Sequence, residues 1–563
     1  MFLIRRKKKR HYVDLSPDEI FVDASNLPAY NEQQFEGRIE QPINRRTFLG
    51  LAIFCLALAL VFGLKIFYLQ VINGADYAER SYNNSLNLTP IFAERGNIYD
   101  RTGQELAWTN QKRVYLAEEG LGHLLGYVSY PNEKEMATGQ YDPKEYLGRA
   151  GVEKIKNANL LGQRGVQIIE INAKGEKLSD HIVQKSFPGQ ELKLSIDHRV
   201  QSKFYDLIKQ LSVDRGFSGG SGVIMDVQTG EILTLVSYPD YDPNIISTGQ
   251  DAQTINQYFS DKNNIMLNRA VSGLYVPGSI FKPFVALGAL SEKIVDPLKN
   301  FVSTGELVVP NPYDKTQNTV FKDWKAHGLV DMRRAIAVSS NVYFYIIGGG
   351  FGDQAGLGID QVGEYAKLFG LSLKTGIDLP SEAEGVIPSP AWKAKNFNGE
   401  PWRLGDTYHT VIGQYGVLVT PIQMARAYSA IANKGKLIQP TVIAIKPEQV
   451  VVQTSIPISA ENFQIIHDGM RRVVLEGTAQ GLNLPNVEIA AKTGTAELGI
   501  SKEKVNSWSV GFWPYQSPRY AFVVAMEKGD RSNLVGGVFV VRQLLDWMSL
   551  NTPEYLAFPL SSF

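Results

Sequence analysis

The stretch Tyr275-Val-Pro-Gly-Ser279-Ile-Phe-Lys282-Pro-Phe284 leads from a turn into an apolar helix. Pro277 and Gly278 form a turn pair, and the apolar residues that follow recur at helical spacing, which places Ser279 at a helix N-terminus. The unpaired N–H groups and the dipole of such an end can stabilise an oxyanion. Burial of Lys282, one turn further on, would lower its pKa and let it take the serine proton. The pair is a candidate nucleophile and base.

The Ser-x-x-Lys spacing alone is a weak signal, because both residue types are common. A second copy, Ser501-Lys-Glu-Lys504, lies in a polar stretch without a turn pair or helix and is interpreted as a solvated loop. For Ser279 the structural alternative is an ordinary helix cap. Other parts of the chain must therefore decide between the two interpretations.

Length and composition exclude several classes of protein. At 563 residues the chain can hold two or three domains. The formal net charge is zero, whereas nucleic-acid binding requires a surplus of basic residues, so no nucleic-acid partner is expected. The single cysteine, Cys55, excludes an intramolecular disulfide and a multi-thiolate metal site, and the seven histidines form no metal signature. We expect neither a metal nor another cofactor.

The N-terminal region predicts a membrane anchor. Residues 1–46 are polar and carry the basic block Arg5–Arg10, and the apolar stretch 47–69 is long enough to span a bilayer. Positive charge on its N-terminal side predicts a cytoplasmic tail and the bulk of the protein outside the cytoplasm. A cleaved signal peptide is the alternative, but its apolar region would be shorter and a small-residue cleavage site would follow. A buried core helix is opposed by the flanking arginines.

Residues 70–193 alternate short strand-like runs with turns and are predicted to form a mostly β pedestal. Within them, Arg95-Gly-Asn-Ile-Tyr-Asp-Arg-Thr-Gly103 is interpreted as a turn closed by ion pairs, with a structural role. A second turn-rich stretch covers residues 148–154. The alternating run 189–197 predicts a strand, and a larger domain is predicted over residues 194–563.

The start of that larger domain favours an antiparallel sheet flanked by helices, an α/β (α+β) class. Residues 198–211 have helical spacing, and residues 222–236 read as two strands joined by a Gln-Thr-Gly turn. Near the other end, the run 535–548 predicts a helix that closes the same sheet.

Ser339-Ser-Asn341 lies between two apolar, helix-like runs, 332–338 and 342–347. A serine and an asparagine two residues apart at a helix junction could present a hydroxyl and an amide to a cleft. Local capping by Ser and Asn is the alternative, so the triplet alone is weak.

Lys-Thr-Gly occurs twice. The copy at residues 374–376 lies in a predicted loop, whereas Lys492-Thr-Gly-Thr495 ends an apolar run and precedes two strand-like segments. On an edge strand Lys492 would supply positive potential, Thr493 and Thr495 would supply hydroxyls for a carboxylate, and Gly494 would leave room for a backbone. This arrangement suits a peptide bound as an added strand.

In order, Ser-x-x-Lys, Ser-x-Asn and Lys-Thr-Gly resemble the motif set of penicillin-recognising acyl-serine enzymes. The stretches 95–101 and 148–154 resemble the non-catalytic domain of class B penicillin-binding proteins, the monofunctional peptidoglycan transpeptidases. Further stretches are similar to the elongation-type member, penicillin-binding protein 2: Tyr238–Asn244, Phe321–Gly328, Gly405–Gln414 and Thr420–Gln423. The resemblance covers roughly residues 45 to 550.

The resemblance implies a role for each motif residue. Ser279 would be acylated, Lys282 would be its general base, Ser339 would relay protons to the leaving amine, and Asn341 would hold the substrate amide. Lys492, Thr493 and Thr495, with Gly494 between them, would bind the terminal carboxylate. The backbone N–H groups of Ser279 and Thr495 would form the oxyanion hole.

The implied reaction crosslinks peptidoglycan stem peptides that end in D-Ala-D-Ala during cell-wall elongation at the bacterial cytoplasmic membrane. β-Lactams would bind the same serine, and a SEDS-family glycosyltransferase is the expected partner. A D,D-carboxypeptidase would use the same residues with water as acceptor. A non-catalytic scaffold or activator of a glycosyltransferase and a β-lactam sensor are alternatives of another class, and the single spanning segment disfavours the sensor.

The chain departs from the elongation-type pattern in three places. Between residues 103 and 148 it is shorter than such relatives, which carry an extra head subdomain, so binding of shape-determining partners through that head does not follow from the resemblance. Gly413-Gln-Tyr-Gly416 replaces the usual Gly-Gln-Gly and is expected to alter a loop. The zinc site of some relatives uses a cysteine near the Ser-x-Asn motif, which this chain lacks.

Overall fold

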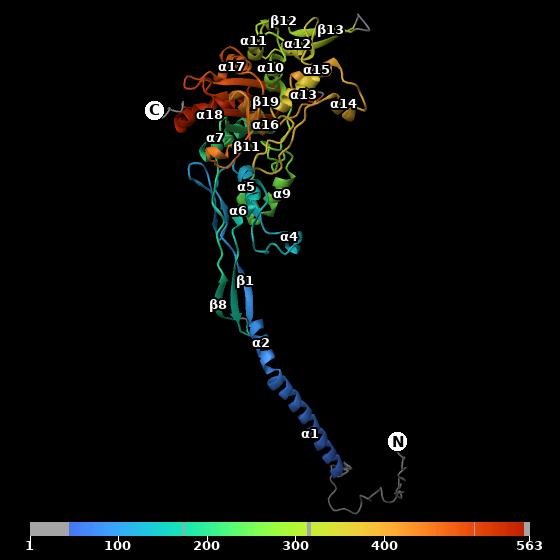
Figure 1. Ribbon diagram of the computed structural model, residues 1–563, viewed down its shortest axis with the longest axis vertical. Helices are drawn as coiled ribbons and strands as arrows, with labels where there is room; N and C mark the ends of the chain where they lie inside the picture. Colours follow the sequence, from blue (N-terminus) through green and yellow to red (C-terminus); the bar gives the residue numbers. More distant parts are fainter. Residues whose placement is uncertain (1–43, 173, 175, 312–316, 500, 557–563) are drawn as a thin grey trace, which may run out of the picture. The chain divides into compact units, whose positions relative to one another are not determined.

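The computed structural model describes residues 44–172, 174, 176–311, 317–499 and 501–556. Almost all of the predicted tail, 1–46, lies outside these residues. The chain divides into two compact units, Met1–Asn87 with Ile169–Ser179, and Leu88–Ile168 with Asp180–Phe563 (Figure 1). Strands β1 (Leu86–Ile91), β7 (Gly165–Ile171) and β8 (Lys177–Gln184) pair in the order β1-β7-β8.

The first unit contains the apolar segment predicted as an anchor. Helix α1 (Arg45–Phe67) continues through a π-helical turn, Tyr68–Ile72, and is followed by α2 (Gly74–Ser85). The continuous helix Arg45–Ile72 is long and apolar enough to cross a membrane, and its most apolar window has no buried residue. An apolar helix with no protein packed on it is typical of a lipid-facing segment.

The N-terminal part of the second unit is built from short elements. Four strands form one sheet in the order β4-β3-β2-β9, and β5 pairs with β6. Their bounds are β2 Ile98–Tyr99, β3 Glu105–Asn110, β4 Lys112–Tyr115, β5 Val128–Ser129, β6 Leu147–Gly148 and β9 Leu192–Lys193. The helices are α3 Gly122–Leu125, α4 Glu133–Ala137, α5 Gly151–Ile155 and α6 Asn157–Leu161.

The strand predicted over 189–197 is wrong in extent, since the ladder is limited to β9 and Leu194 adds only an isolated bridge to Ile443. The backbone N–H groups beyond it bond to three separate segments: Leu194 donates to Tyr99, Ser195 to Val442 and Asp197 to Leu233. Changing partners at successive residues prevents one continuous ladder.

The prediction that ion pairs close the turn at residues 95–103 is also wrong. Arg95 instead pairs with the fully buried Glu153 at 2.5 Å. The turn is closed by Asp100, whose Oδ1 accepts the backbone N–H groups of Thr102 at 2.7 Å and Gln104 at 2.9 Å. Asp and Asn side chains commonly close turns in this way.

The larger part of the second unit is organised around a five-stranded antiparallel sheet, which confirms the predicted class. Its strand order is β11-β10-β20-β19-β18. The bounds are β10 Gly219–Asp226, β11 Ile232–Tyr238, β18 Ala490–Leu498, β19 Lys504–Trp513 and β20 Tyr520–Asp530. The pairing of β10 with β11 confirms the hairpin predicted over 222–236.

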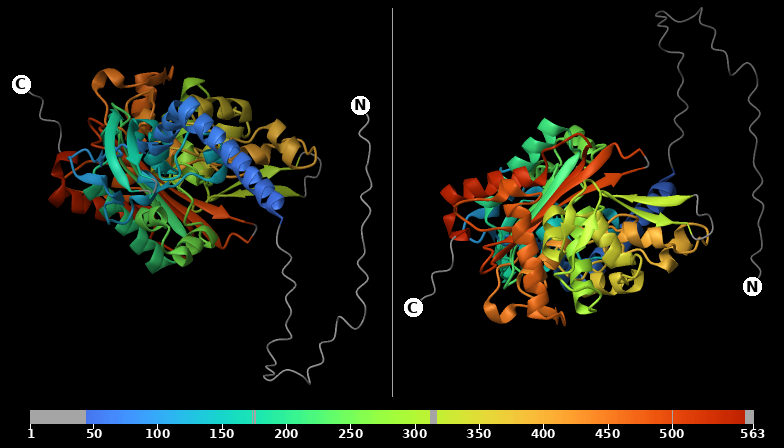
Figure 2. Two further views of the ribbon diagram at one scale, coloured as in Figure 1. Left: turned by 90° about the horizontal axis from the view of Figure 1, so that it is seen from below. Right: turned by 90° about the horizontal axis from the view of Figure 1, so that it is seen from above.

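Helices cover both faces of this sheet (Figure 2). Helices α7 (His198–Arg215) and α18 (Gly537–Asn551) pack together on one face, and α16 (Pro421–Ala432) and α17 (Ala460–Leu475) lie on the other. Helices α7 and α18 lie where the side-chain spacing predicted them. Since β18 is at the edge of the sheet, one side of the strand that carries Lys-Thr-Gly is not paired with another strand.

The remaining elements of the second unit are helices, short strands and 3-10 turns. The helices are α8 Pro243–Thr248, α9 Ala252–Ser260, α10 Lys282–Ser291, α11 Met332–Val338, α12 Asn341–Gly349, α13 Ile359–Leu368, α14 Pro390–Asn396 and α15 Leu404–Val411. The short strands are β12 Phe301–Ser303, β13 Glu306–Pro310, β14 Asn318–Lys322, β15 Gly328–Val330, β16 Lys436–Ile438 and β17 Val452–Ser455. Within the described residues, 3-10 turns cover Gly278–Phe281, Pro447–Gln449, Gln480–Leu482 and Pro553–Tyr555.

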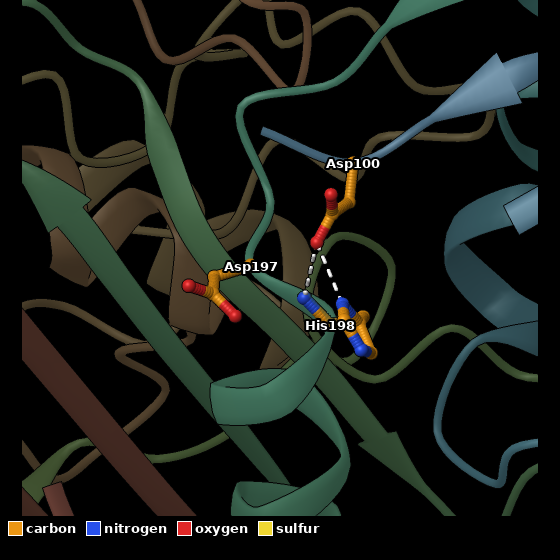
Figure 3. Close-up of side chains that lie close together, drawn as sticks. All are labelled: Asp100, Asp197 and His198. Atoms are coloured by element: carbon orange, nitrogen blue, oxygen red, sulfur yellow. Dashed lines mark hydrogen bonds and ion pairs between the residues drawn. The ribbon is translucent and has the colours of Figure 1, made fainter. Parts of the chain in front are cut away.

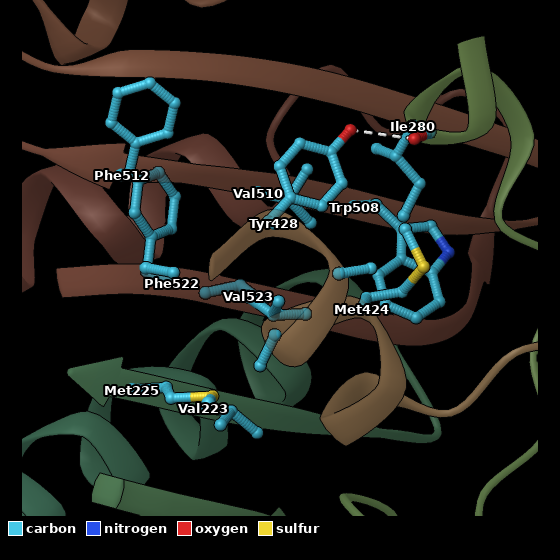
Figure 4. Packing of buried hydrophobic residues seen from close by; sticks show 14 of the residues in the cluster. Val223, Met225, Ile280, Met424, Tyr428, Trp508, Val510, Phe512, Phe522 and Val523 are labelled. Carbon is cyan, nitrogen blue, oxygen red and sulfur yellow. Dashed lines mark hydrogen bonds between the residues drawn. The ribbon is translucent and has the colours of Figure 1, made fainter. Parts of the chain in front are cut away.

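The core connects the sheet to the serine turn through α16 (Figure 4). Met424 and Tyr428 of that helix are fully buried among strand side chains such as Val510 and Phe522. The Tyr428 hydroxyl donates to the carbonyl oxygen of Ile280, the residue after the candidate nucleophile, at 2.7 Å. A buried hydroxyl needs such a partner, so core packing also fixes the turn.

Candidate active site

Ser279 lies in the 3-10 turn Gly278–Phe281, which leads directly into α10. The structure thus inserts one tight turn before the predicted helix. Gly278 has a φ of +59°, a conformation that favours glycine, and its N–H donates to the carbonyl of Gly413 at 2.9 Å. The first turn leaves the Ser279 N–H without an intrahelical acceptor, as an oxyanion donor requires. Ser279 itself is half-buried.

Lys282 begins α10 and is fully buried. Its Nζ donates to the Ser339 carbonyl and to Asn341 Oδ1, both at 2.7 Å. Burial disfavours the ammonium form and lowers the pKa of Lys282 to about 7, although the charge of Asp323 acts in the opposite direction. A large fraction of this amine is therefore neutral near pH 7 and able to accept a proton.

The Ser339-Ser-Asn341 triplet is the junction between α11 and α12, which confirms the two helices predicted around it. Ser339 has a φ of +58°, a left-handed conformation that is uncommon for serine. Ser340 caps α12 by accepting the Tyr343 N–H at 3.3 Å. Thus the capping role belongs to Ser340, whereas the side chains of Ser339 and Asn341 contact Lys282.

Lys492, on the edge strand β18, also contacts Ser339. Its Nζ donates to Ser339 Oγ at 2.8 Å, while the Lys282 Nζ lies 3.4 Å from that oxygen. Burial and the nearby charge of Lys282 hold the pKa of Lys492 well below its usual range. Among the residues that the structure describes, neither lysine has a carboxylate within ion-pair distance. The Ser339 hydroxyl therefore bridges two buried amines, an arrangement suited to moving a proton.

The residues after Lys492 run beside the serine turn. A Cβ atom on Gly494 would lie 2.7 Å from the Pro277 carbonyl, so the two backbones touch where this residue has no side chain. Thr493 Oγ1 lies 2.5 Å from Thr478 Oγ1, and Thr495 is exposed on the strand. The three motifs, which span residues 279 to 495 of the chain, meet around Ser339.

Replacing Gly494 by alanine is expected to lower the rate of acylation of Ser279 about 100-fold, because the added methyl group must push β18 away from the serine turn. Overpacking of this kind costs about 1–3 kcal/mol of stability. Stopped-flow measurement with a fluorescent penicillin gives the rate, and thermal unfolding gives the stability.

Gly363→Ala is the matched control, since no atom lies within 4 Å of the position that its Cβ would take. It should acylate at the rate of the unaltered protein. A Gly494→Ala protein that acylates equally fast would mean that the two backbones separate without consequence.

Sequence reasoning gave no role at the site to three residues that lie here. Gly413 accepts the Gly278 N–H, Thr478 contacts Thr493, and Asp323 lies behind the Ser339 junction. No spacing links them to the motifs. Asp323 falls within the stretch 321–328 that carried the family resemblance, which was the only available signal for it.

The altered loop at residues 413–416 is stabilised by aromatic packing. Tyr415 has a φ of +56°, and its ring stacks on Phe397 with a centroid distance of 6.1 Å and meets Trp392 edge-on. These contacts support a backbone conformation that tyrosine rarely adopts. The loop thereby keeps the Gly413 carbonyl against the serine turn.

A second cluster of ligand-type side chains lies far along the chain from this site. Asp100, Asp197 and His198 offer atoms within 4.8 Å of one another (Figure 3). His198 Nδ1 lies 2.6 Å from Asp100 Oδ2, and Asp197 Oδ2 accepts from Arg199 and Tyr555, each at 2.7 Å. Because protein donors occupy these oxygens, we assign the cluster a structural role.

Comparisons with known proteins agree with this geometry. The family described as "Penicillin binding protein transpeptidase domain" matches residues 220–543, and "Penicillin-binding Protein dimerisation domain" matches residues 107–194. The chain is 34% identical to the peptidoglycan D,D-transpeptidase MrdA of Acinetobacter baumannii over 75% of this chain and 64% of that protein. Identity to the MrdA of Escherichia coli K12 is 26%, over 89% of this chain and 93% of that protein.

Two solved structures have a similar fold. Penicillin-binding protein 2 of Pseudomonas aeruginosa superposes with a TM-score of 0.69 at 29% identity, covering 84% of this chain and 99% of that chain. A chain from a structure titled "Structural coordination of polymerization and crosslinking by a peptidoglycan synthase complex" has a TM-score of 0.70 at 26% identity, covering 89% and 97%.

Proposed function

The chain belongs to the penicillin-binding protein transpeptidase family, and on that premise we propose that it is an elongation-type peptidoglycan D,D-transpeptidase acting through an acyl-serine intermediate. The observation that carries the proposal is the Ser339 hydroxyl, which bridges two buried lysines, one of them Lys282, one turn after Ser279. Such an arrangement supplies a nucleophile, a base and a proton relay in one place.

In the first half-reaction the Ser279 hydroxyl attacks the carbonyl of the D-Ala-D-Ala bond, and the neutral Lys282 amine takes its proton. The N–H groups of Ser279 and Thr495 stabilise the oxyanion. Ser339 then delivers a proton to the leaving nitrogen, and D-Ala departs. In the second half-reaction an amine of a neighbouring stem peptide attacks the acyl-serine, and the peptide crosslink forms as Ser279 is regenerated.

The stem peptide lies along the free edge of β18 as an added strand. Lys492, Thr493 and Thr495 bind its terminal carboxylate, and Asn341 holds an amide of its backbone. Gly494 leaves the space that close approach of the peptide requires. β-Lactams occupy the same position and acylate Ser279.

The membrane arrangement is part of the proposal. The stretch 47–69 anchors the protein in the bacterial cytoplasmic membrane, with the tail, 1–46, in the cytoplasm and the pedestal, 70–193, and transpeptidase domain, 194–563, outside it. The apolar helix Arg45–Ile72 supports this reading. A SEDS-family glycosyltransferase is the proposed partner, and similarity to a chain of a peptidoglycan synthase complex that coordinates polymerisation with crosslinking supports it.

Incubation of the detergent-solubilised full-length protein with a D-Ala-D-Ala stem peptide and an acceptor amine is expected to yield a crosslinked product and free D-Ala, measured by liquid chromatography and mass spectrometry. Release of D-Ala with hydrolysis only, at every acceptor concentration, would favour the D,D-carboxypeptidase. The same reaction after penicillin treatment is the control, since acylated Ser279 should give neither product.

A further inference from the structure

A buried carboxylate lies directly behind the Ser339 junction. The Asp323 side chain is 0% exposed, in the connection between β14 and β15. Its Oδ2 accepts the hydroxyl of Ser340 at 2.9 Å, the hydroxyl of Ser303 at 3.3 Å and the backbone N–H of Val342 at 3.0 Å. Its Oδ1 accepts the Trp324 N–H at 2.9 Å. Both oxygens therefore receive donors.

These contacts hold the two residues on either side of Asn341. Ser340 and Val342 are bound to the same carboxylate oxygen, so the backbone between them is fixed at both ends. Val342 is also in the first turn of α12, where a negative charge interacts favourably with the helix dipole. A junction that contains a left-handed serine needs this kind of support, because its conformation is unfavourable by itself.

The junction in turn positions the reacting groups. The Ser339 carbonyl and Asn341 Oδ1 accept from the Lys282 amine, and the Ser339 hydroxyl accepts from Lys492. A shift of the junction would change all three distances together. Asp323 thus acts on the site through a single layer of intervening residues.

Asp323 is also the carboxylate whose charge acts on Lys282. The other charged or titratable groups that face this lysine are Lys492 of β18 and His327, which immediately precedes β15. His327 Nε2 lies 3.7 Å from Asp323 Oδ1, and burial lowers its pKa. The charged or titratable groups around the Asp323 carboxylate, which are Lys282, Lys492 and His327, are therefore neutral or positive.

We propose that Asp323 is a positioning residue for acylation, whose buried carboxylate fixes Ser340 and Val342 and through them places Ser339 and Asn341 against the two catalytic lysines. This inference rests on the proposed acyl-serine function. It assigns Asp323 no contact with the substrate.

The test is Asp323→Asn in the full-length protein, with the acylation rate by fluorescent penicillin measured against pH. Asparagine has one acceptor oxygen where Asp323 uses two, so one set of donors would face an NH₂ group. We expect acylation about 100-fold slower. The rising limb of the pH profile should move to lower pH, because the negative charge that favours the Lys282 ammonium is gone. A purely structural role would not move this limb.

Two further variants separate charge from positioning and from folding. Ser340→Ala removes one donor and keeps the charge, so it should slow acylation about tenfold without moving the limb. Asp378→Asn is the matched control, since Asp378 accepts a hydroxyl from Thr441 at 2.7 Å and the Val442 N–H at 2.8 Å outside the site. It should acylate normally.

Acylation of Asp323→Asn at the unaltered rate with an unmoved limb would overturn the inference. A decrease in the acylation rate of Asp323→Asn that is fully explained by its smaller folded fraction, measured by thermal unfolding, would also overturn the inference. If that variant does not fold, Ser340→Ala decides, and a normal rate there overturns the inference. Failure of the unaltered protein to label at Ser279 would instead overturn the proposed function, and this inference with it.

Discussion

Replacement of Ser279 by alanine is expected to abolish covalent labelling of the protein by fluorescent penicillin. Alanine has no oxygen to carry the acyl group, and the fold should be unaffected, since the Ser279 hydroxyl makes no hydrogen bond within the described residues. Gel fluorescence measures the labelling, and mass spectrometry of a proteolytic digest of the unaltered protein should place the adduct on the peptide that contains Ser279.

Ser272→Ala is the matched control. Ser272 precedes the same turn, and its hydroxyl donates to the Ser381 carbonyl at 2.6 Å, away from the lysines. This variant should label fully. Labelling of another serine in the Ser279→Ala protein would contradict the assignment of Ser279 as the nucleophile. Full complementation of a depletion strain by Ser279→Ala would favour the non-catalytic scaffold.

The acylation rate is expected to rise with pH through about 7 and to level off above it, because Lys282 in its neutral form is the proposed base and burial lowers its pKa to about 7. Replacing Lys282 by methionine should slow acylation by about 10²–10⁴-fold and remove this pH dependence. Methionine keeps an unbranched chain in the buried space, which limits the loss of packing. Stopped-flow rates between pH 5 and 9 measure both effects.

The control is Lys367→Met, which changes an exposed lysine on α13 and should preserve both the rate and the profile. A Lys282→Met protein that retains the rising limb would show that another group takes the serine proton. Lys492 is the nearest candidate, since it donates to the same Ser339 hydroxyl.

Short-range patterns predicted the local structure well and failed where the chain makes distant contacts. The helix from His198 and the β10–β11 hairpin follow from side-chain spacing and a Gly-containing turn, which act over a few residues. The strand over 189–197 was wrong because its N–H groups bond to segments as distant as Val442. The turn at Arg95 was misread for the same reason, since its ion-pair partner is Glu153.

The sequence by itself determined the candidate reactive groups: Ser279 and Lys282 one turn apart before an apolar helix, a serine and an asparagine at a helix junction, and Lys-Thr-Gly on a strand. Spacing along one element fixes such relations without reference to the rest of the fold.

Only the tertiary structure decided that the Ser339 hydroxyl bridges Lys282 and Lys492, and that a carboxylate from Asp323 supports the junction. The pKa of Lys282 depends on burial by segments from across the chain, and the need for glycine at 494 depends on the carbonyl of Pro277. Desolvation and steric contact act through space, so neither can be read from spacing along the chain.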